Sequence, residues 1–184
     1  YNKADNKHII HIEEKEDVNA DLENMLLGTV EEAASRLSHM RETEGTFLKS
    51  DLIAHAKKLE TEVEAVEERA PEVVKQYRSR LKQKLAEAVG DTFDQNRLLT
   101  EIALFTDKAD IHEEISRLKS HIAQFLESLE TIGPIGRKLD FLIQEMNRET
   151  NTIGSKANDA IIARKVVEMK TTLEKMKEQV QNVE

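Results

Sequence analysis

The chain has 184 residues, of which 34% are charged and only 4% aromatic, with six glycines and two prolines. This composition favours long, solvent-exposed helices over a sheet, so we expect an all-α fold. The absence of cysteine excludes disulfides and thiolate metal sites, and no apolar run approaches the roughly 20 residues needed to span a bilayer.

The formal net charge of −9 is unevenly distributed along the chain. Residues 1–70 carry 17 Asp and Glu against 9 Lys and Arg, whereas residues 72–90 are locally basic. Nucleic acids bind to clustered Lys and Arg, so the overall charge argues against such a partner. The basic segment leaves two interpretations open: a nucleic-acid surface and a solvated helix face.

Residues 1–18 are expected to be the remnant of a preceding domain. They contain the strand-like segment "HIIHIEE" at residues 8–14, and the chain opens on Tyr1, which we read as a cut edge. A single strand is not stable by itself, so its pairing partner should lie elsewhere. His8 and His11 do not predict a metal site, because a spacing of three places them on opposite faces of a strand.

Residues 19–90 are expected to form a long helical hairpin region. Apolar side chains recur every three or four positions over residues 22–66, which is the helical period. Gly45 is expected to mark a kink or a tight turn. Pro71 fits the first turn of a new helix, which should end at Gly90.

Residues 91–184 are expected to form a C-terminal helical domain with the active site. Asp94 is a candidate cap for a first helix, and Asp110 with Glu113 has the spacing of a capping box before a second. The stretch "TIGPIG" at residues 131–136 predicts a clear break.

The last helix has the pattern of a coiled-coil seam. Apolar residues from Ile162 to Val183 alternate in steps of four and three, a period of 3.5. We expect this helix to pack against another long helix, within the chain or across a subunit boundary. The whole chain should therefore be an elongated multi-helix bundle.

The helix after residue 110 carries acidic, cationic and imidazole groups on one face. At 100° per residue, four side chains fall within about 60° of one another: Asp110, Glu114, Arg117 and His121. Such a set can perform acid–base or metal-assisted chemistry. The alternative is an ordinary Glu–Arg helix pair beside a cap.

The segment "GRKLDFLIQEMNRETNTIGSKAND" at residues 136–159 combines a core stripe with an unusual polar face. The side chains opposite the core are Arg137, Phe141, Gln144, Arg148 and Asn151. An exposed aromatic residue between two Arg residues suits base stacking and phosphate contact, and it suits a second packing interface equally. We read "NTIGSKAND" as a turn before the last helix.

Glu145 and Glu149 lie one helical turn apart on the flank of the same helix and repel each other when both are ionised. They call for a nearby cation, either Arg148 or a hard divalent metal ion. Simple solvation of the two carboxylates is the alternative.

Several stretches resemble the YicC/YloC family of bacterial proteins: "EGTFLKSDL", "YRSRL", "NRLLTEIALFTDKADIHEEISRLKSHIAQF", the segment at residues 136–159 and the terminal "EQVQNVE". The resemblance runs from about residue 21 to the end of the chain. It implies a cytoplasmic endoribonuclease that depends on Mn²⁺ or Mg²⁺, assembles as a hexamer and works with other RNA-degradation enzymes. It also implies a further N-terminal domain, so the chain alone could be inactive.

The expected RNA surface includes only residues that lie inside the quoted stretches, and their roles are our hypothesis. The surface also includes Glu101, Asp110 and Asp140. The catalytic candidates are His121, Glu114, Arg117 and Glu145. The RNA-binding candidates are Arg97, Arg137, Phe141, Gln144, Arg148, Asn151 and Lys156, and the metal candidates are Glu114, Glu145 and Glu149.

A competing hypothesis is a non-catalytic, oligomeric helical scaffold or RNA-binding adaptor that presents RNA to other nucleases. The net charge and the absence of a Walker loop, a dinucleotide glycine motif, a zinc-peptidase helix or a nucleophile elbow favour it.

Overall fold

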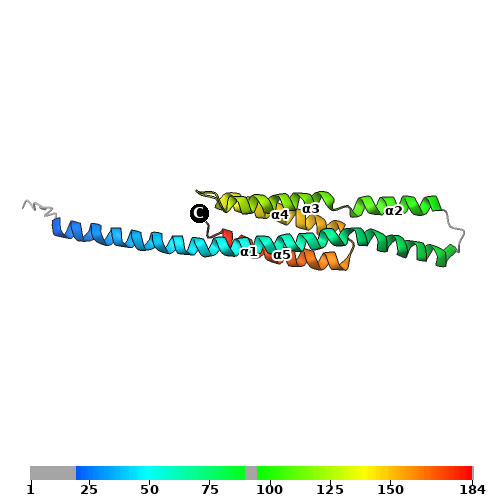
Figure 1. The fold of residues 1–184 in the computed structure, drawn as a ribbon, viewed down its shortest axis with the longest axis horizontal. Coiled ribbons are helices and arrows are strands. Elements are labelled where there is room, and N and C mark those ends of the chain that lie inside the picture. The colour runs from blue at the N-terminus through cyan, green and yellow to red at the C-terminus, as the bar shows by residue number, and fades with distance from the viewer. Residues whose placement is uncertain (1–19, 90–94, 184) are drawn as a thin grey trace, which may run out of the picture. The chain divides into compact units, whose positions relative to one another are not determined.

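The computed structural model describes residues 20–89 and 95–183. Within these ranges the regular secondary structure consists of α1 (Ala20–Val89), α2 (Gln95–Ala109), α3 (His112–Ser128), α4 (Gly136–Lys156) and α5 (Ala160–Val180) (Figure 1). The prediction of an all-α chain is confirmed for the part that is described. The strand expected at residues 8–14 and the cap expected at residue 94 lie outside these ranges.

The chain divides into two units, Tyr1–Thr43 and Glu44–Glu184, and α1 contributes residues to both. In the first unit, the side chains of residues 21–43 are all exposed, including an apolar stripe that contains Leu22, Leu26 and Leu37. The buried core belongs to the second unit. None of the described helices combines the length and the apolar character that crossing a bilayer demands.

The hairpin expected within residues 19–90 is wrong, because α1 is one helix of 70 residues that continues through Gly45 and Pro71. Proline inside a helix removes one backbone hydrogen bond and crowds the preceding turn. Here the turns on both sides of Pro71 are held by packing, since Val66 is fully buried and Val73 is 7% exposed. Tertiary contacts therefore keep the helix continuous where the local sequence favours a break.

Two ion pairs show how α1 lies against α3 and the residues that directly follow it. The Nζ atom of Lys49 is 2.8 Å from a carboxylate oxygen of Glu130, and that of Lys119 is 2.6 Å from Glu67. Residue numbers rise along α1 while they fall along α3, so the two helices are antiparallel.

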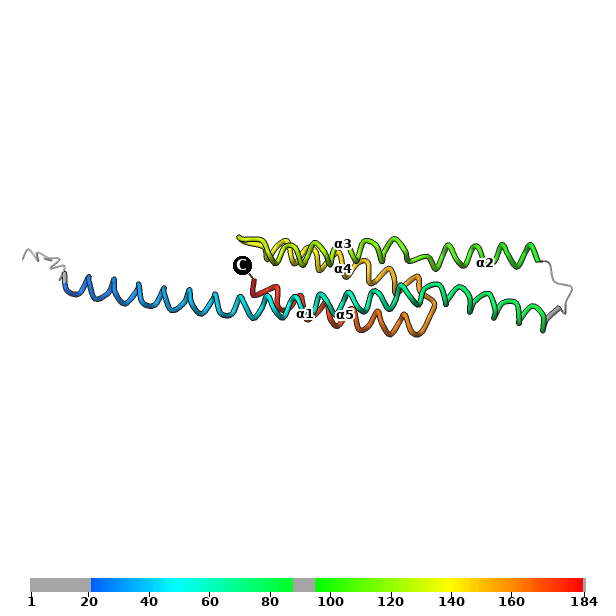
Figure 2. The backbone as a smooth tube through the Cα atoms, in the orientation of Figure 1, coloured from blue at the N-terminus to red at the C-terminus, as the bar shows by residue number. Residues whose placement is uncertain are grey.

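A second pair of contacts ties α1 to α5. The Thr172 hydroxyl donates a hydrogen bond of 3.4 Å to Glu62, and Arg69 lies 2.8 Å from Asp159. Residue numbers rise along α1 while they fall along α5, so these two helices are also antiparallel. Since α4 packs against both α3 and α5, the order around the second unit is α1, α3, α4, α5 (Figure 2).

The core of the second unit fills the space between these helices. Its largest fully buried side chains are Phe125, Leu52, Leu59, Leu118, Ile122, Leu139, Ile143, Met146, Ile153, Ile162, Met169 and Leu173. Burying each such side chain contributes about 1.5–3 kcal/mol, so this layer supplies the main drive for folding. The apolar seam predicted for the last helix is buried from Ile162 to Val180, and it packs within the chain.

The start of α3 differs in detail from the capping box that the sequence predicts. The side chain of Asp110 accepts a hydrogen bond from the backbone N–H of His112 at 3.0 Å, but Glu113 pairs with Arg117 instead of reaching back to the cap. The residue at the cap position is Ile111, which offers no side-chain hydrogen bond. Its burial, at 2% exposure, anchors this end of the helix.

The turn predicted over "NTIGSKAND" is much shorter than expected, because α4 continues to Lys156. Thr150 and Ile153 are fully buried, and packing of these side chains keeps the last turns helical. Only residues 157–159 connect α4 to α5. Asp159 caps α5 by accepting hydrogen bonds from the backbone N–H groups of Ile161 and Ile162, both at 3.0 Å.

Candidate metal centre

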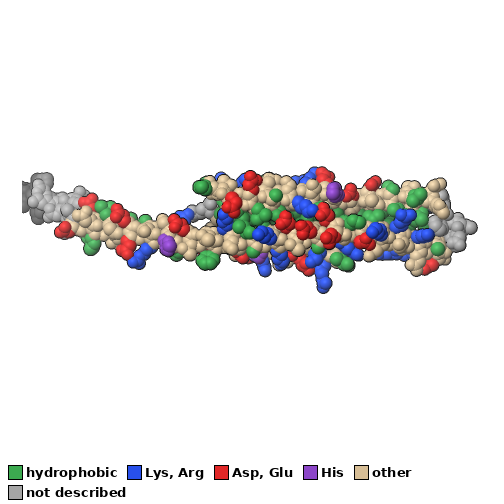
Figure 3. Space-filling model, viewed as in Figure 1, with side chains coloured by type: hydrophobic (Ala, Val, Ile, Leu, Met, Phe, Trp, Pro, Cys, Tyr) green, Lys and Arg blue, Asp and Glu red, His purple; other side chains and the backbone are tan. Residues whose placement is uncertain are grey.

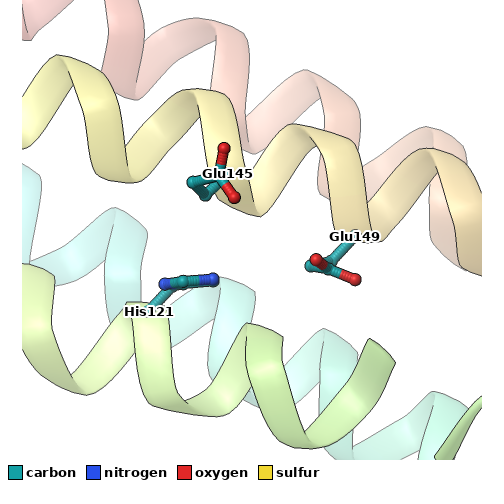
Figure 4. A group of neighbouring side chains, drawn as sticks. All are labelled: His121, Glu145 and Glu149. Atoms are coloured by element: carbon teal, nitrogen blue, oxygen red, sulfur yellow. The ribbon is translucent and has the colours of Figure 1, made fainter. Parts of the chain in front are cut away.

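The antiparallel contact of α3 with α4 brings opposite charges together along one seam. At one end, Nζ of Lys156 lies 2.7 Å from a carboxylate oxygen of Glu114. One turn further along α3, a guanidinium nitrogen of Arg117 lies 3.8 Å from a carboxylate oxygen of Glu149. The next turn of α3 presents His121 to the same stretch of α4 (Figure 4).

His121, Glu145 and Glu149 form a cluster whose candidate ligand atoms all lie within 4.8 Å of one another. Figure 4 shows the three side chains directed into a common space between α3 and α4. The helical period explains this, because Glu145 and Glu149 are one turn apart and point in nearly the same direction. His121 approaches them from the facing helix.

The two carboxylates of this cluster have weak positive partners. Glu149 is only 4% exposed, yet its cation, Arg117, stands at 3.8 Å and is shared with Glu113. Glu145 has Arg148 at 3.6 Å on the exposed side of the helix. Two neighbouring carboxylates, one of them buried, need a compensating positive charge inside the protein. A divalent cation between them would supply it.

The imidazole supports the same conclusion. Among the described residues, the buried side-chain atoms without a hydrogen-bond partner are Nδ1 of His121 and Oε2 of Glu114. Leaving a buried polar atom unpaired costs about 1–3 kcal/mol, so such atoms mark positions built for a further partner. Mn²⁺ accepts both imidazole nitrogen and carboxylate oxygen as ligands, so all three side chains could coordinate it. Mg²⁺ prefers oxygen ligands, so only the two carboxylates would coordinate it.

The polar face of α4 borders this cluster. Phe141 is 57% exposed, and Arg148 beside it is exposed as well. At 100° per residue, Phe141 lies about 40° and Arg148 about 60° around the helix from Glu145. The aromatic ring therefore stands, largely open to solvent, next to the candidate ligands.

Residues 66–184 match the family model described as "Endoribonuclease YicC-like, C-terminal". The chain belongs to this family. It is 46% identical to the "Probable endoribonuclease YicC" of Clostridioides difficile (strain 630) over 178 residues, which cover 96% of this chain and 61% of the relative. It is 37% identical to the protein of the same name from Haemophilus influenzae (strain ATCC 51907 / DSM 11121 / KW20 / Rd) over 145 residues, or 79% of this chain and 50% of the relative.

The chain thus spans 50% to 61% of the length of these YicC relatives. All three members of the cluster lie inside the range that matches the YicC-like model. The region of family likeness therefore contains the whole candidate centre.

The structure brings together six of the residues that the sequence nominated: Glu114, Arg117, His121, Glu145, Glu149 and Lys156. Glu114, which the sequence places among the metal candidates, has one carboxylate oxygen 2.7 Å from Lys156 and the other buried without a hydrogen-bond partner. His121 lies beside the carboxylates of Glu145 and Glu149. Lys156, which the sequence predicts to bind RNA, forms an ion pair with Glu114.

Other nominated residues lie away from the cluster. Arg97 is exposed near the start of α2, 12 residues and therefore about 18 Å before the end of that helix. Arg137 and Gln144 line a groove between the start of α4 and the end of α5, together with Lys177. Asn151 is exposed on α4.

Three other nominated acids also stay outside the cluster. Asp110 caps the start of α3, Asp140 accepts a hydrogen bond of 2.7 Å from Gln144, and Glu101 is exposed on α2.

The sequence analysis assigns Glu113 to a capping box and does not predict that it shares Arg117 with Glu149. The signal was present, because Glu113 and Arg117 have the i, i+4 spacing of a helical ion pair. The proximity of His121 to Glu145 and Glu149 had no comparable local signal, since it depends on the register between two helices.

Proposed function

We propose that this chain carries the catalytic centre of a metal-dependent endoribonuclease that cleaves phosphodiester bonds in RNA. The observation that carries the proposal is the cluster of His121, Glu145 and Glu149 on the α3–α4 seam. The names of the relatives, probable endoribonucleases, supply the reaction class. Assembly as a hexamer, cooperation with other RNA-degradation enzymes and a cytoplasmic location belong to the same proposal and rest on the family resemblance.

In this proposal the three cluster residues hold a divalent ion, with Mn²⁺ favoured over Mg²⁺ by the imidazole. When bound, the ion supplies Lewis-acid polarisation of the scissile phosphate and lowers the pKa of an attacking water. His121 then serves as a ligand, so of the two kinds of chemistry that the sequence suggests for its helix face, acid–base and metal-assisted, the proposal assigns it to the second.

The surrounding residues orient both the ligands and the substrate. Arg117 holds the buried carboxylate of Glu149 in place, and the Glu114–Lys156 pair fixes the next turn of the seam. Arg148 and Phe141 stand on the exposed side, where a guanidinium can contact phosphate and a ring can stack on a base. The substrate strand would therefore run along α4 beside the cluster.

The test uses the whole protein with a fluorogenic RNA. Metal-stripped protein should be inactive, and Mn²⁺ should restore cleavage. H121A and E149Q should each reduce the rate by at least about 100-fold, since each removes a ligand. His112→Ala is the matched control, because His112 is exposed on the same helix, and it should cleave at the wild-type rate. Rates within about twofold of wild type for both cluster variants would overturn the assignment.

The exposed face of Phe141 and Arg148 also fits a second candidate function, an RNA-binding adaptor without catalysis. This face needs no metal ion. The adaptor predicts RNA binding that persists in EDTA together with no cleavage in Mn²⁺. A nuclease predicts cleavage that follows the metal.

A further inference from the structure

The C-terminal part of α1 and the whole of α2 form a hairpin that lies outside the α3–α4 seam. Here we call residues 72–89 and 95–109 the α1–α2 hairpin. Its two helices are joined by the stacked rings of Tyr77 and Phe105, whose centroids are 3.6 Å apart with an angle of 5° between the planes. None of the residues of α2 is buried, so this hairpin presents most of its surface to solvent.

The α1 arm of the hairpin contains an unusually long stretch without acids. The chain carries 36 Asp and Glu in 184 residues, about one in five, yet residues 73–86 include none. The same stretch holds five cations: Lys75, Arg78, Arg80, Lys82 and Lys84. This segment is therefore strongly positive within a chain whose net charge is −9.

Most of these cations also lack an acidic partner. Lys75 pairs with Glu72 at 2.6 Å, but the other four form no ion pair with any described residue. All five are exposed. By contrast, Arg117, Arg148 and Lys156 near the candidate centre each have a carboxylate partner. Figure 3 shows Lys and Arg side chains on the part of the molecule that α2 and the end of α1 form.

Three of the five cations are arranged along the outward face of the helix. Lys75, Arg78 and Lys82 have the spacing i, i+3, i+7, which places them within about 60° of one another and over about 10 Å of helix. Val73, at 7% exposure, and the half-buried Tyr77 face inward. Like charges so close together repel each other, and a bound polyanion would relieve that repulsion.

One of the nominated RNA-binding residues belongs to the same surface. Arg97 is exposed near the start of α2, forms no ion pair with a described residue, and lies close in sequence to the end of α1 at Val89. Because Arg97 lies away from the cluster of His121, Glu145 and Glu149, it would bind RNA as part of the hairpin surface.

We propose that the α1–α2 hairpin is a second RNA-binding surface, which holds the phosphate backbone of the substrate outside the metal centre. The identity of the polyanion rests on the proposed function, which makes RNA the substrate. Arg and Lys without acidic neighbours, on an exposed helix, are the groups that neutralise phosphates and release counterions.

The distance between the two surfaces suits one RNA strand. The Glu67–Lys119 ion pair places residue 67 of α1 level with the middle of α3, where His121 lies. Arg78 is 11 residues further along α1, which corresponds to about 16 Å. At about 3.4 Å per phosphate, as in one strand of a duplex, this span corresponds to about five phosphates.

The test compares RNA binding by two variants with four neutralised cations each. The hairpin variant is R78Q/R80Q/K82Q/K84Q. The matched control is K57Q/R164Q/K170Q/K175Q, which removes the same charge from exposed positions on α1 and α5 that form no ion pair with a described residue. Binding of a fluorescent oligoribonucleotide is measured by anisotropy in EDTA, so cleavage is not needed. Circular dichroism and thermal melting confirm that both variants fold.

We expect the hairpin variant to bind at least about tenfold more weakly than wild type. The slope of the logarithm of the binding constant against the logarithm of the salt concentration should be shallower by about 0.7 for each phosphate that the protein no longer neutralises. The control variant should bind RNA with an affinity within about twofold of that of wild type. Equal affinity of both variants would overturn the proposal. So would displacement of RNA by polyglutamate at equal charge concentration, because it would indicate an acidic protein as the partner.

Failure of this proposal is distinguishable from failure of the proposed function. Metal-dependent cleavage with unchanged binding by the hairpin variant would refute the second surface alone. Binding that depends on the hairpin, without cleavage in Mn²⁺ by the whole protein, would refute the nuclease alone.

Discussion

Asp159 joins two helices through a single carboxylate. It accepts hydrogen bonds from the backbone N–H groups that open α5, and it receives Arg69 of α1 at 2.8 Å. The hydrogen bond from Arg69 is the main reason why the pKa of Asp159 lies below its ordinary value, and the backbone N–H groups lower it further. The folded state is therefore stabilised by the ionised form.

We expect Asp159→Ala to destabilise the chain by about 1 kcal/mol through removal of the cap alone, and by more when Arg69 has no partner. Asp159→Asn keeps the cap and should cost less. The advantage of wild type over Asp159→Asn should be complete above about pH 4 and shrink as pH falls further, because the folded pKa is the lower one. Urea unfolding midpoints measured from neutral pH down through the ordinary Asp pKa of about 3.9 test this. A difference that stays constant with pH would contradict it.

Glu62 shows the opposite behaviour on the same helix. It is 5% exposed, and burial raises the pKa of its carboxyl, although Lys58 partly offsets the rise. The folded chain therefore prefers the protonated acid. Since the folded pKa is raised, Glu62 weakens stability progressively as pH rises through the acidic range, and the penalty is complete above the folded pKa.

Glu62→Gln should therefore raise the unfolding midpoint at about pH 7–8 and have little effect near pH 4, where the wild-type acid is protonated. The amide oxygen can still accept a hydrogen bond from the hydroxyl of Thr172. Glu60→Gln, two residues away on the exposed side of α1, is the control and should show no such pH dependence. A loss of stability in Glu62→Gln at neutral pH would mean that Lys58 and the surrounding polar groups outweigh the burial.

At the scale of the helix, Pro71 is the unfavourable point of α1. A proline inside a helix costs up to about 3 kcal/mol relative to alanine, because one hydrogen bond is missing and the ring crowds the previous turn. We expect Pro71→Ala to raise the free energy of unfolding by about 1–3 kcal/mol, measured in urea. The chain carries helix on both sides of residue 71, so alanine fits the backbone. A destabilised variant would show that the proline ring itself contributes packing.

The same proline shows which helix boundaries cannot be predicted from local sequence. Helical periodicity predicted α2, α3 and the seam of α5, because each of these elements carries its own apolar stripe. Local helix propensity predicts a boundary at Pro71 and an early end of α4. It takes no account of the burial of Val66 and Ile153, which keeps each helix continuous. Tertiary packing decided both cases.

The candidate site was predictable in part for a related reason. The helical wheel located both faces, Glu114, Arg117 and His121 on one helix and the two Glu residues on the other. It could not tell which of the first group meets Glu145 and Glu149. That depends on the register between α3 and α4, which their shared core and the connection at residues 129–135 determine.

For the whole molecule, the candidate metal centre lies between two helices. Its candidate ligands come from α3 and α4, which pack against each other. A ligand that binds only the folded chain stabilises it by mass action, by about 2.7 kcal/mol at 100 times its Kd. Metal binding is therefore measurable as stability, without any assay of cleavage.

We expect Mn²⁺ at saturating concentration to raise the Tm of metal-stripped protein by about 5–10 °C, since about 1 kcal/mol corresponds to 2–4 °C for a chain of this size. The shift should disappear in E145Q/E149Q, because the neutral amides lack the negative charge with which the two carboxylates attract a divalent cation. Glu174→Gln on the exposed side of α5 should keep the full shift. An undiminished shift in E145Q/E149Q would place the stabilising ion elsewhere, and the α3–α4 seam would then be an ordinary polar contact whose buried carboxylate depends on Arg117 alone.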